Sequence, residues 1–232
     1  MMARTLDVTT SFAASVARLG SGMAVGPFGP RPKKRLELYE FESCPYCRKV
    51  REALSMLDLE VAIYPCPKGG TRFRGLAKKL GKVQFPLLVD PNTDTEMYES
   101  DDIVAHLYRT YGAGDPPFLL RLGPLTLLGS ALASAIRPTM GLRAVSSRRP
   151  RKPLDLWSFE ASPYCRIARE ALCVLELPYV LHNVAKDSPS RAEFVKRSGK
   201  MQVPYLADPN TSKEMFESSD IVRYLFETYA ET

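Results

Sequence analysis

The chain has 232 residues, of which 45% are hydrophobic and 25% are charged, and its formal net charge is +6. This balance is typical of a globular protein and excludes a wholly disordered chain, a collagen-like repeat and a polytopic membrane protein. Five cysteines are too few for a disulfide-stapled secreted scaffold of this length, and two histidines leave little material for a His-based metal site.

The positive charge is unevenly distributed along the chain. Residues 1–35 carry a net charge of +5 and residues 113–153 carry +6, whereas residues 36–112 carry −2 and residues 154–232 carry −3. A nucleic-acid-binding domain usually presents a basic folded face. Because the excess Lys and Arg lie outside the two acidic segments, we expect no nucleic-acid partner.

The two acidic segments are copies of each other. A shift of 118 residues aligns residues 36–112 with residues 154–230 without a gap, and about 35 of the 77 positions are identical. Two long copies indicate a duplicated domain rather than a solenoid. The sequence therefore predicts an N-terminal extension (1–35), a first domain (36–112), a linker (113–153) and a second domain (154–232).

The N-terminal extension is rich in Ala, Ser, Gly and Arg, and Asp7 is its one acidic residue. This composition is typical of an organelle transit segment, and it lacks the uninterrupted apolar core of a secretory signal. The alternative is an extension of the mature protein that packs on the domains through Phe12, Val16 and Leu19.

The sequence of the first domain predicts the element order βαβαββα, and the second domain repeats this order. Apolar periodicity indicates strands at 36–41, 61–64, 86–89 and 96–98, a helix at 45–57, and a weak helix at 73–80 that ends at Gly81. We expect Ser100 to cap the last helix, with Asp101 and Asp102 in its first turn beside the positive end of the helix.

A Cys-Pro-Tyr-Cys tetrad at residues 44–47 opens the first of these helices. The helix dipole and free amides at a helix N-terminus stabilise a thiolate, so we expect the pKa of Cys44 to lie below about 8.5. Arg48 would add positive charge. Cys44 is then a nucleophile toward disulfides, with Cys47 as resolving thiol or buried bystander. The alternative is a tetrad that survives in a degenerate domain.

A zinc site at the tetrad would need two further ligands. Cys66 is the one nearby candidate, and the chain has no second CxxC, so we expect no metal site. Cys173 lies near the apolar face of the corresponding helix in the second domain and is expected to be a core residue.

The linker contains an apolar stretch, residues 118–136, interrupted by Arg121 and Pro124 and followed by basic residues up to Lys152. A spanning helix needs about 20 apolar residues, so this stretch is marginal as a membrane span. We expect a partly helical connector between the domains. The alternatives are contact of residues 118–152 with a membrane surface and a true span.

Three features together resemble a known family: the tetrad, the Gln84-Phe85-Pro86 loop and the Glu99-Ser100 pair. At this spacing they resemble the thioredoxin fold in its glutaredoxin and glutathione-transferase N-domain form. The paired arrangement is similar to plant and algal plastid proteins with tandem glutathione-transferase N-domains. The resemblance covers about two thirds of the chain. It implies an α/β protein with two tandem thioredoxin-like domains joined by the linker.

The resemblance also implies how the first domain would bind glutathione. Pro86 is expected to follow a cis peptide bond, which would expose the backbone of Phe85 for pairing with the tripeptide. Glu99 and Ser100 match the position that holds its γ-glutamyl end, and a helix N-terminus suits a carboxylate.

The second domain departs from the family pattern at the first tetrad position, where Ser162 replaces cysteine although Cys165 remains. The matching pocket positions are Val203, Pro204, Glu217 and Ser218. Serine cannot take part in thiol–disulfide exchange. Ser162 either holds a glutathione thiolate through its hydroxyl, as in some transferases, or marks a domain kept for structure or partner binding.

These features lead to two main functional hypotheses. The first is a glutathione-dependent thiol–disulfide oxidoreductase that acts through the first domain on an unknown disulfide substrate. The alternative is a non-enzymatic plastid interaction or assembly factor that retains the fold. An iron–sulfur cluster bound by Cys44 and glutathione across a dimer is a weaker third idea.

A conventional detoxifying transferase is disfavoured. Such enzymes add a helical domain of more than a hundred residues for the electrophile, whereas about 40 residues separate the two repeats here. A reducing compartment suits the free CxxC. We therefore expect the chloroplast as location, with the mitochondrion as the alternative.

Overall fold

The computed structural model of the chain describes residues 22–79, 81–121 and 141–231. Residues 1–21 of the expected extension (1–35) and residues 122–136 of the apolar linker stretch (118–136) therefore fall outside the described residues. The linker begins with a short helix, α5 (Phe118–Arg121). In the described part of the chain, no helix is long and apolar enough to cross a membrane.

The first half has the expected element order. Its elements are β1 (Leu36–Glu40), α2 (Pro45–Met56), β2 (Val61–Pro65), α3 (Arg74–Lys79), β3 (Leu87–Asp90), β4 (Thr95–Met97) and α4 (Ser100–Tyr111). Strand β1 pairs in parallel with β2 and antiparallel with β3, which pairs with β4. The predicted thioredoxin-like arrangement is confirmed.

The second half repeats these elements in the same order. They are β5 (Leu154–Ser158), α7 (Pro163–Val174), β6 (Tyr179–Asn183), α8 (Ser190–Ser198), β7 (Tyr205–Asp208), β8 (Lys213–Phe216) and α9 (Ser218–Tyr229). Strand pairing is also repeated, with β5 parallel to β6 and antiparallel to β7.

The two halves share one sheet. Strands β2 and β6 pair antiparallel, so the described residues form an eight-stranded sheet in the order β4-β3-β1-β2-β6-β5-β7-β8. In the register of this pair Ala62 lies opposite Val180, its own counterpart in the repeat. The halves are therefore related by an approximate two-fold axis between these strands, and each covers the sheet edge that the other would expose.

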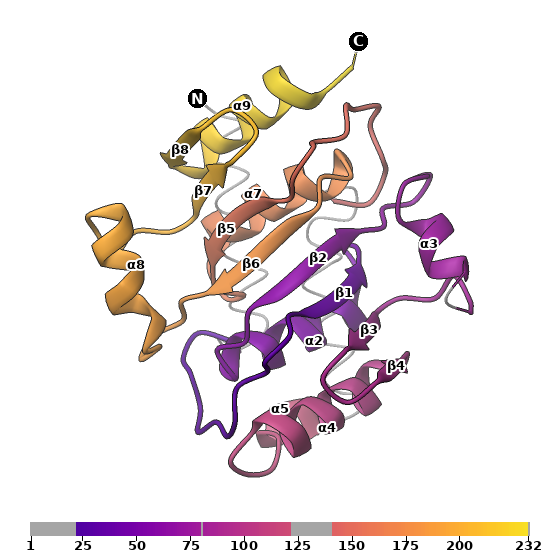
Figure 1. The fold of residues 1–232 in the computed structure, drawn as a ribbon, viewed down its shortest axis with the longest axis vertical. Helices are drawn as coiled ribbons and strands as arrows, with labels where there is room; N and C mark the ends of the chain where they lie inside the picture. The colour runs from indigo at the N-terminus through magenta and orange to yellow at the C-terminus, as the bar shows by residue number, and fades with distance from the viewer. Residues whose placement is uncertain (1–21, 80, 122–140, 232) are drawn as a thin grey trace.

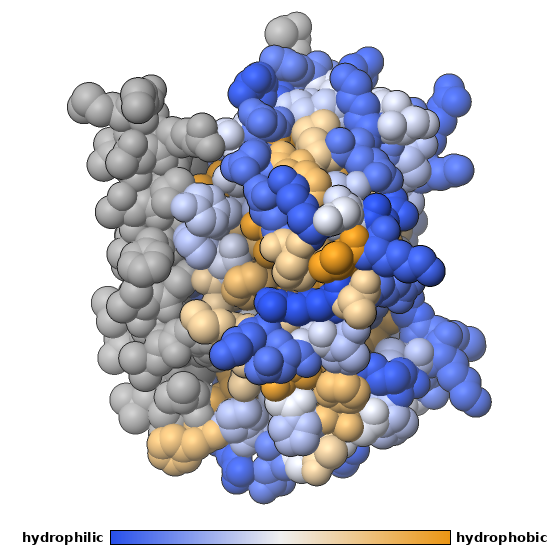
Figure 2. Space-filling view, turned by 90° about the vertical axis from the view of Figure 1, so that its left-hand side faces the viewer, coloured by the Kyte–Doolittle hydropathy of each residue, from blue (hydrophilic) through white to orange (hydrophobic). Residues whose placement is uncertain are grey.

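Helices cover the sheet symmetrically about this axis. In Figure 1, α2 and α7 lie behind the strands, α4 and α9 lie at the two ends, and α3 and α8 lie at opposite sides. One hydrophobic core runs through both halves and includes Leu38, Leu54, Leu156 and Leu172. The face shown in Figure 2 is largely hydrophilic, with apolar residues in small groups between charged ones.

A buried ionic network joins the halves. Nε of Arg51 lies 3.0 Å from Glu160, and Nε of its counterpart Arg169 lies 3.1 Å from Glu42, which is the counterpart of Glu160. Arg51 also contacts Glu40. All five side chains are at most 4% exposed. Buried charges need such pairing because removal from water is costly, so this network fixes the two halves relative to each other.

The segments before each half also correspond. Ala24 bridges to Lys186 in the second half, and Arg143 bridges to Lys68, the counterpart of Lys186, in the first. Phe28 and Ser147 bridge to Gly112 and Ala230, which are likewise counterparts. Each half thus carries a preceding strap, residues 22–35 and 141–153, that reaches across to the other half.

Candidate functional site

Cys44 lies at the N-cap of α2, as the sequence predicted. Its backbone is extended, Pro45 begins the helix, and its Sγ accepts a hydrogen bond from the Cys47 amide at 3.3 Å. A side chain in this position satisfies one of the free amides of the first turn. Cys44 is 3% exposed and Cys47 is fully buried.

The two thiols of the tetrad differ in acidity. A hydrogen bond from the Cys47 side chain lowers the pKa of Cys44, and this effect, with the amides of Cys47 and Tyr46, outweighs burial and the charge of Glu40. Burial raises the pKa of Cys47 well above its usual value. Negative charge is therefore favoured on Cys44 while Cys47 keeps its proton. This is the division expected between an attacking and a resolving thiol.

Arg48 does not contribute the positive charge that the sequence suggested for Cys44. The guanidinium is buried, and its electrostatic partners include Glu160 and Glu42 of the network between the halves. Arg48 lies on the side of α2 that faces the other half, and it belongs to that interface.

A pocket of about 280 Å³ opens beside the start of α2. It is lined by Tyr46, Gln84, Phe85, Pro86, Glu99 and Ser100. The Phe85–Pro86 peptide bond is cis, as the resemblance implied. The four first-domain residues predicted to contact glutathione thus lie together.

Glu99 lines this pocket and has an unusual backbone conformation. Its φ of 63° lies in the left-handed region, which non-glycine residues rarely adopt, and such strain often marks functional positions. Glu99 is the N-cap of α4, and Ser100 is the first helical residue. The expectation that Ser100 caps the helix was therefore wrong, because the chain enters the helix only after the left-handed turn at Glu99. The Glu99 carboxylate accepts a hydrogen bond from Nε2 of Gln84 instead.

The second half reproduces the scaffold with a hydroxyl in place of the thiol. Ser162 is the N-cap of α7, and its Oγ accepts from the Cys165 amide at 3.3 Å. Val203–Pro204 is also a cis peptide bond. Gln202 donates to Glu217 at 2.6 Å, and Glu217 again has a left-handed φ, 66°, directly before Ser218. The reactive position differs in one atom, and the residue before the cis proline also differs, Phe85 in the first half and Val203 in the second.

Sequence reasoning did not assign Tyr46 and Gln84 to the site. Tyr46 lines the pocket and is 46% exposed, as is its counterpart Tyr164. Gln84 orients Glu99, and Gln202 repeats that contact. Both residue types are retained in the two copies while many neighbours differ, and this retention is the signal that could have identified them.

The other cysteines are buried away from the tetrad. Burial raises the pKa of Cys66, of Cys165 and of Cys173. Cys173 is a core residue, as expected, and it lies between the halves, where its thiol donates to the Gly141 carbonyl at 3.3 Å. Within the described residues, no three His, Cys, Asp or Glu side chains are grouped so that they could hold a metal ion.

Comparison with known families agrees with this geometry. The family described as "Glutathione S-transferase, N-terminal domain" matches residues 38–117 and again residues 156–232. Comparisons with curated proteins and with solved structures gave no significant match. The two matched segments make up more than half of the chain, and each carries one copy of the site. The chain therefore belongs to the glutathione S-transferase N-terminal domain family and contains that domain twice.

Proposed function

We propose that the protein is a glutathione-dependent thiol–disulfide oxidoreductase that acts through its first domain. The observation that carries this proposal is the acidity difference between Cys44 and Cys47 in a tetrad whose Tyr46 lines the same pocket as Phe85 and Glu99. The family match supports glutathione as the small-molecule partner.

The proposed reaction is a sequence of thiol–disulfide exchanges. The Cys44 thiolate attacks the glutathione sulfur of a mixed disulfide, a new Cys44–glutathione disulfide forms, and the target protein leaves as a thiolate that takes up a proton. A second glutathione thiolate then attacks the glutathione sulfur on Cys44, which releases oxidised glutathione and restores the Cys44 thiolate. In the alternative branch Cys47 attacks the Cys44 sulfur, reduced glutathione leaves, and a Cys44–Cys47 disulfide forms.

The pocket residues would position glutathione for this exchange. Free amides at the N-terminus of α4 and the Ser100 hydroxyl suit the γ-glutamyl carboxylate. The Glu99 carboxylate suits the neighbouring ammonium group. Backbone atoms of Phe85 would pair with the extended tripeptide and keep its sulfur near Cys44.

A second candidate is a glutathione-binding interaction protein without catalysis. Two observations favour it: Cys44 is only 3% exposed, and Ser162 cannot exchange disulfides although its surroundings match those of Cys44.

We also propose that residues 1–35 direct the protein to the chloroplast. A fluorescent protein fused behind these residues should enter plastids in plant cells, and mitochondrial or cytosolic fluorescence would contradict this.

The two candidate functions predict different results in a catalytic assay, because only the oxidoreductase should turn over a glutathionylated substrate. The chain should reduce a glutathionylated peptide with glutathione as reductant, and Cys44→Ser should abolish the reaction. Glu99→Gln should raise the KM for glutathione while leaving the pKa of Cys44 unchanged, because its carboxylate contacts the tripeptide. Glutathione binding without turnover in the unmodified chain would favour the second candidate.

A further inference from the structure

The exposed cations of the first domain are concentrated in one segment. Residues 36–112 hold ten Lys and Arg, and six of them lie within residues 66–86, which contain no Asp or Glu. Three others, Arg48, Lys49 and Arg51, are buried in α2. The domain as a whole has a negative net charge, so its exposed positive charge is gathered almost entirely in this segment.

This segment begins beside the tetrad and forms one surface with the second strap. The Cys66 amide donates to the carbonyl of Glu40, at the end of β1, at 2.6 Å, and Nη1 of Arg74 donates to the Cys66 carbonyl at 2.9 Å. Lys68 bridges to Arg143 of the strap. We call the following six residues the basic surface, of which Arg74 is half-buried and the others are exposed: Lys68, Arg74, Lys78, Lys79, Lys82 and Arg143.

Two members of the basic surface lie next to the proposed glutathione pocket. The Arg74 guanidinium lies over the ring of Phe85, 5.1 Å from its centroid, and Nζ of Lys82 lies 4.9 Å from the ring centroid of Tyr98, directly before Glu99. Phe85 and Glu99 both line the pocket. A peptide that holds its disulfide in this pocket would therefore place its neighbouring residues within reach of these cations.

The basic surface is not neutralised by carboxylates of its own chain. Within residues 22–79, 81–121 and 141–231, no ion pair joins any of its six cations to an Asp or Glu. Near the start of α4, the Glu99 carboxylate accepts from Gln84 and Asp101 is paired with Lys49. Uncompensated positive charge of this kind attracts an anionic partner.

The second half does not reproduce this concentration of charge. Residues 66–86 carry a net charge of +6, whereas the corresponding residues 184–204 carry +3. Ala192 is the counterpart of Arg74, and Val203 is the counterpart of Phe85, so the cation above the pocket residue is present in the first half alone.

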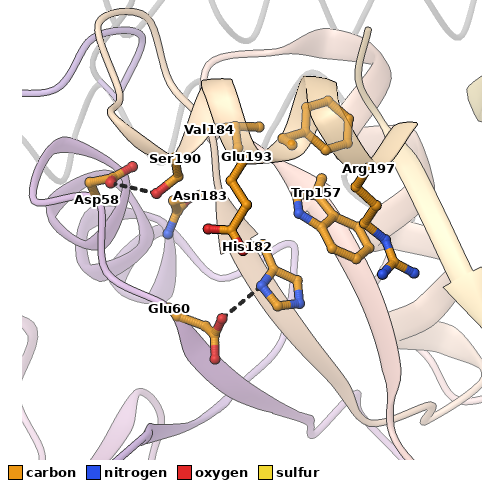
Figure 3. A pocket seen from close by; sticks show the side chains of 10 residues that line it. Asp58, Glu60, Trp157, His182, Asn183, Val184, Ser190, Glu193 and Arg197 are labelled. Atoms are coloured by element: carbon orange, nitrogen blue, oxygen red, sulfur yellow. Dashed lines mark hydrogen bonds and ion pairs between the residues drawn. The ribbon is translucent and has the colours of Figure 1, made fainter. Parts of the chain in front are cut away.

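The charges that the second half does carry are mixed. Helix α8, which lies on the opposite side of the molecule from α3 (Figure 1), bears Glu193 as well as Arg197, and Figure 3 shows both side chains beside one cavity. Arg197 is paired with Glu214, and Asp187 adds a further negative charge before the helix. The uncompensated surface therefore belongs to the half with the reactive thiol and is not a property of the duplicated fold.

We propose that the basic surface docks an acidic segment of the protein substrate, so that this site acts on proteins whose reacting cysteine is flanked by Asp or Glu. The inference rests on the proposed function, because it names the substrate class of the same site. Docking adds no chemical step. It would steer the substrate toward Cys44 and hold its disulfide there while the exchange takes place.

Two glutathionylated peptides of equal length test this preference. One carries two glutamates on each side of its cysteine and the other carries two lysines, so the glutathionyl group is the same in both. After subtraction of the uncatalysed rate, the full chain at low salt should reduce the acidic peptide with a kcat/KM at least about tenfold higher, within the range of electrostatic steering. The preference should shrink at high salt, which screens exposed charges.

The repeat supplies matched charge reversals. Lys68→Glu combined with Lys78→Glu changes the basic surface, and Lys186→Glu combined with Lys196→Glu changes the counterpart positions of the second half. All four lysines are exposed, so both double variants should keep the fold. The first should remove most of the preference for the acidic peptide, and the second should leave it unchanged. Reduction of glutathionyl 2-hydroxyethyl disulfide, which has no flanking residues, should be equal in both.

Peptide binding separates a failure of this inference from a failure of the proposed function. The anisotropy of a fluorescent acidic peptide without glutathione reports docking to Cys44→Ser, whether or not the unmodified chain turns over. Tighter binding of the acidic than of the basic peptide, weakened by the first double variant alone, supports docking. If such binding occurs without turnover, only the redox function fails.

Three results would overturn the inference even in an active oxidoreductase. The first is equal turnover and equal binding of the acidic and basic peptides. The second is an equal effect of the two double variants. The third is binding to phosphatidylserine vesicles that the first double variant abolishes, without any peptide preference, which would assign the basic surface to a membrane instead.

Discussion

Cys44 and Ser162 occupy the same place in two copies of one site, and each accepts a backbone amide at 3.3 Å. The surrounding cis proline, glutamine and left-handed glutamate are also repeated. At the first tetrad position the halves differ in one atom, a sulfur or an oxygen, and the pocket residue before the proline changes from Phe85 to Val203. This arrangement makes each half a control for the other.

The acidity of Cys44 should depend on Cys47. Cys47→Ala removes the thiol that donates to Cys44, so the pKa of Cys44 should rise. The rate of iodoacetamide labelling of Cys44, followed by peptide mass against pH, should then reach its half-maximum at higher pH than in the unmodified chain. An unchanged pH profile would show that the Cys47 hydrogen bond does not set this acidity.

Ser162→Cys should create a second reactive thiol. The new sulfur would lie at the N-cap of α7 with the same amide donor as Cys44. Labelling at pH 7 should then modify residue 162 at a rate within about tenfold of Cys44, since a helix N-terminus lowers thiol pKa values. Labelling only at the pH of an ordinary thiol would mean that features outside the tetrad activate Cys44.

At the scale of elements, the β2–β6 pair is reinforced by an ion pair across the two halves. Nδ1 of His182 lies 2.7 Å from Glu60, and Nε2 lies 2.8 Å from Asp155. Burial lowers the pKa of His182, but hydrogen bonds to Asp155 and Glu60 outweigh burial and raise it overall. The His182 hydrogen bond is the main cause that lowers the pKa of Glu60 to about 2.

Glu60→Gln should therefore destabilise the protein in a pH-dependent way. The raised pKa of His182 gives stability below 6.5 that is lost as pH rises through the raised value, and the lowered pKa of Glu60 gives stability above 4.5 that is lost as pH falls toward 2. Between pH 4.5 and pH 6.5 the substitution should lower the free energy of unfolding by about 1 kcal/mol, a figure that allows for solvent screening. At pH 8.5 the loss should be smaller. Urea unfolding at several pH values measures this, with exposed Glu96→Gln as control. A cost independent of pH would contradict the ion pair.

At the scale of the whole molecule, the shared sheet, the common core and the reciprocal straps make the two domains one folding unit. Arg51 lies at the centre, in contact with Glu40, Glu42 and Glu160. Removal of a buried arginine leaves carboxylates without their counter-charge, which is more costly than never having buried the charges.

Arg51→Met should therefore lower the free energy of unfolding by about 3–5 kcal/mol. Arg35→Met removes an exposed arginine paired with Glu60 and should cost less than about 1 kcal/mol. Urea denaturation followed by circular dichroism compares the two. Equal costs would show that the network between the halves does not hold them together.

Much of each half could be predicted from sequence because the signals are local. Strand and helix periodicity and the N-cap at Cys44 are read from neighbouring residues, and the family resemblance gave the cis bond before Pro86. The β2–β6 pairing could not be predicted, because the sequence of neither strand indicates which strand of the other half pairs with it. Arg51 and Arg169 look like members of solvated helix faces until the second half covers them.

The same limit applies to the sites. Phe85, Pro86, Glu99 and Ser100 belong to recognisable motifs, and the structure brings them together. A cavity of about 300 Å³ is lined by Asp58 of the first half and Asn183 of the second half, 125 positions apart, and no motif marks it. Such sites follow from the relation between the halves, which only the three-dimensional arrangement shows.

The most direct test of the central claim is the intact mass of the chain after exposure to oxidised glutathione at neutral pH, beside Cys44→Ser. If Cys44 is the nucleophile, the chain should gain one glutathione, or lose two hydrogens as the Cys44–Cys47 disulfide forms. Cys44→Ser should show neither change. An unmodified chain at pH 7, or the same adduct in Cys44→Ser, would contradict the assignment of Cys44 as the reactive thiol.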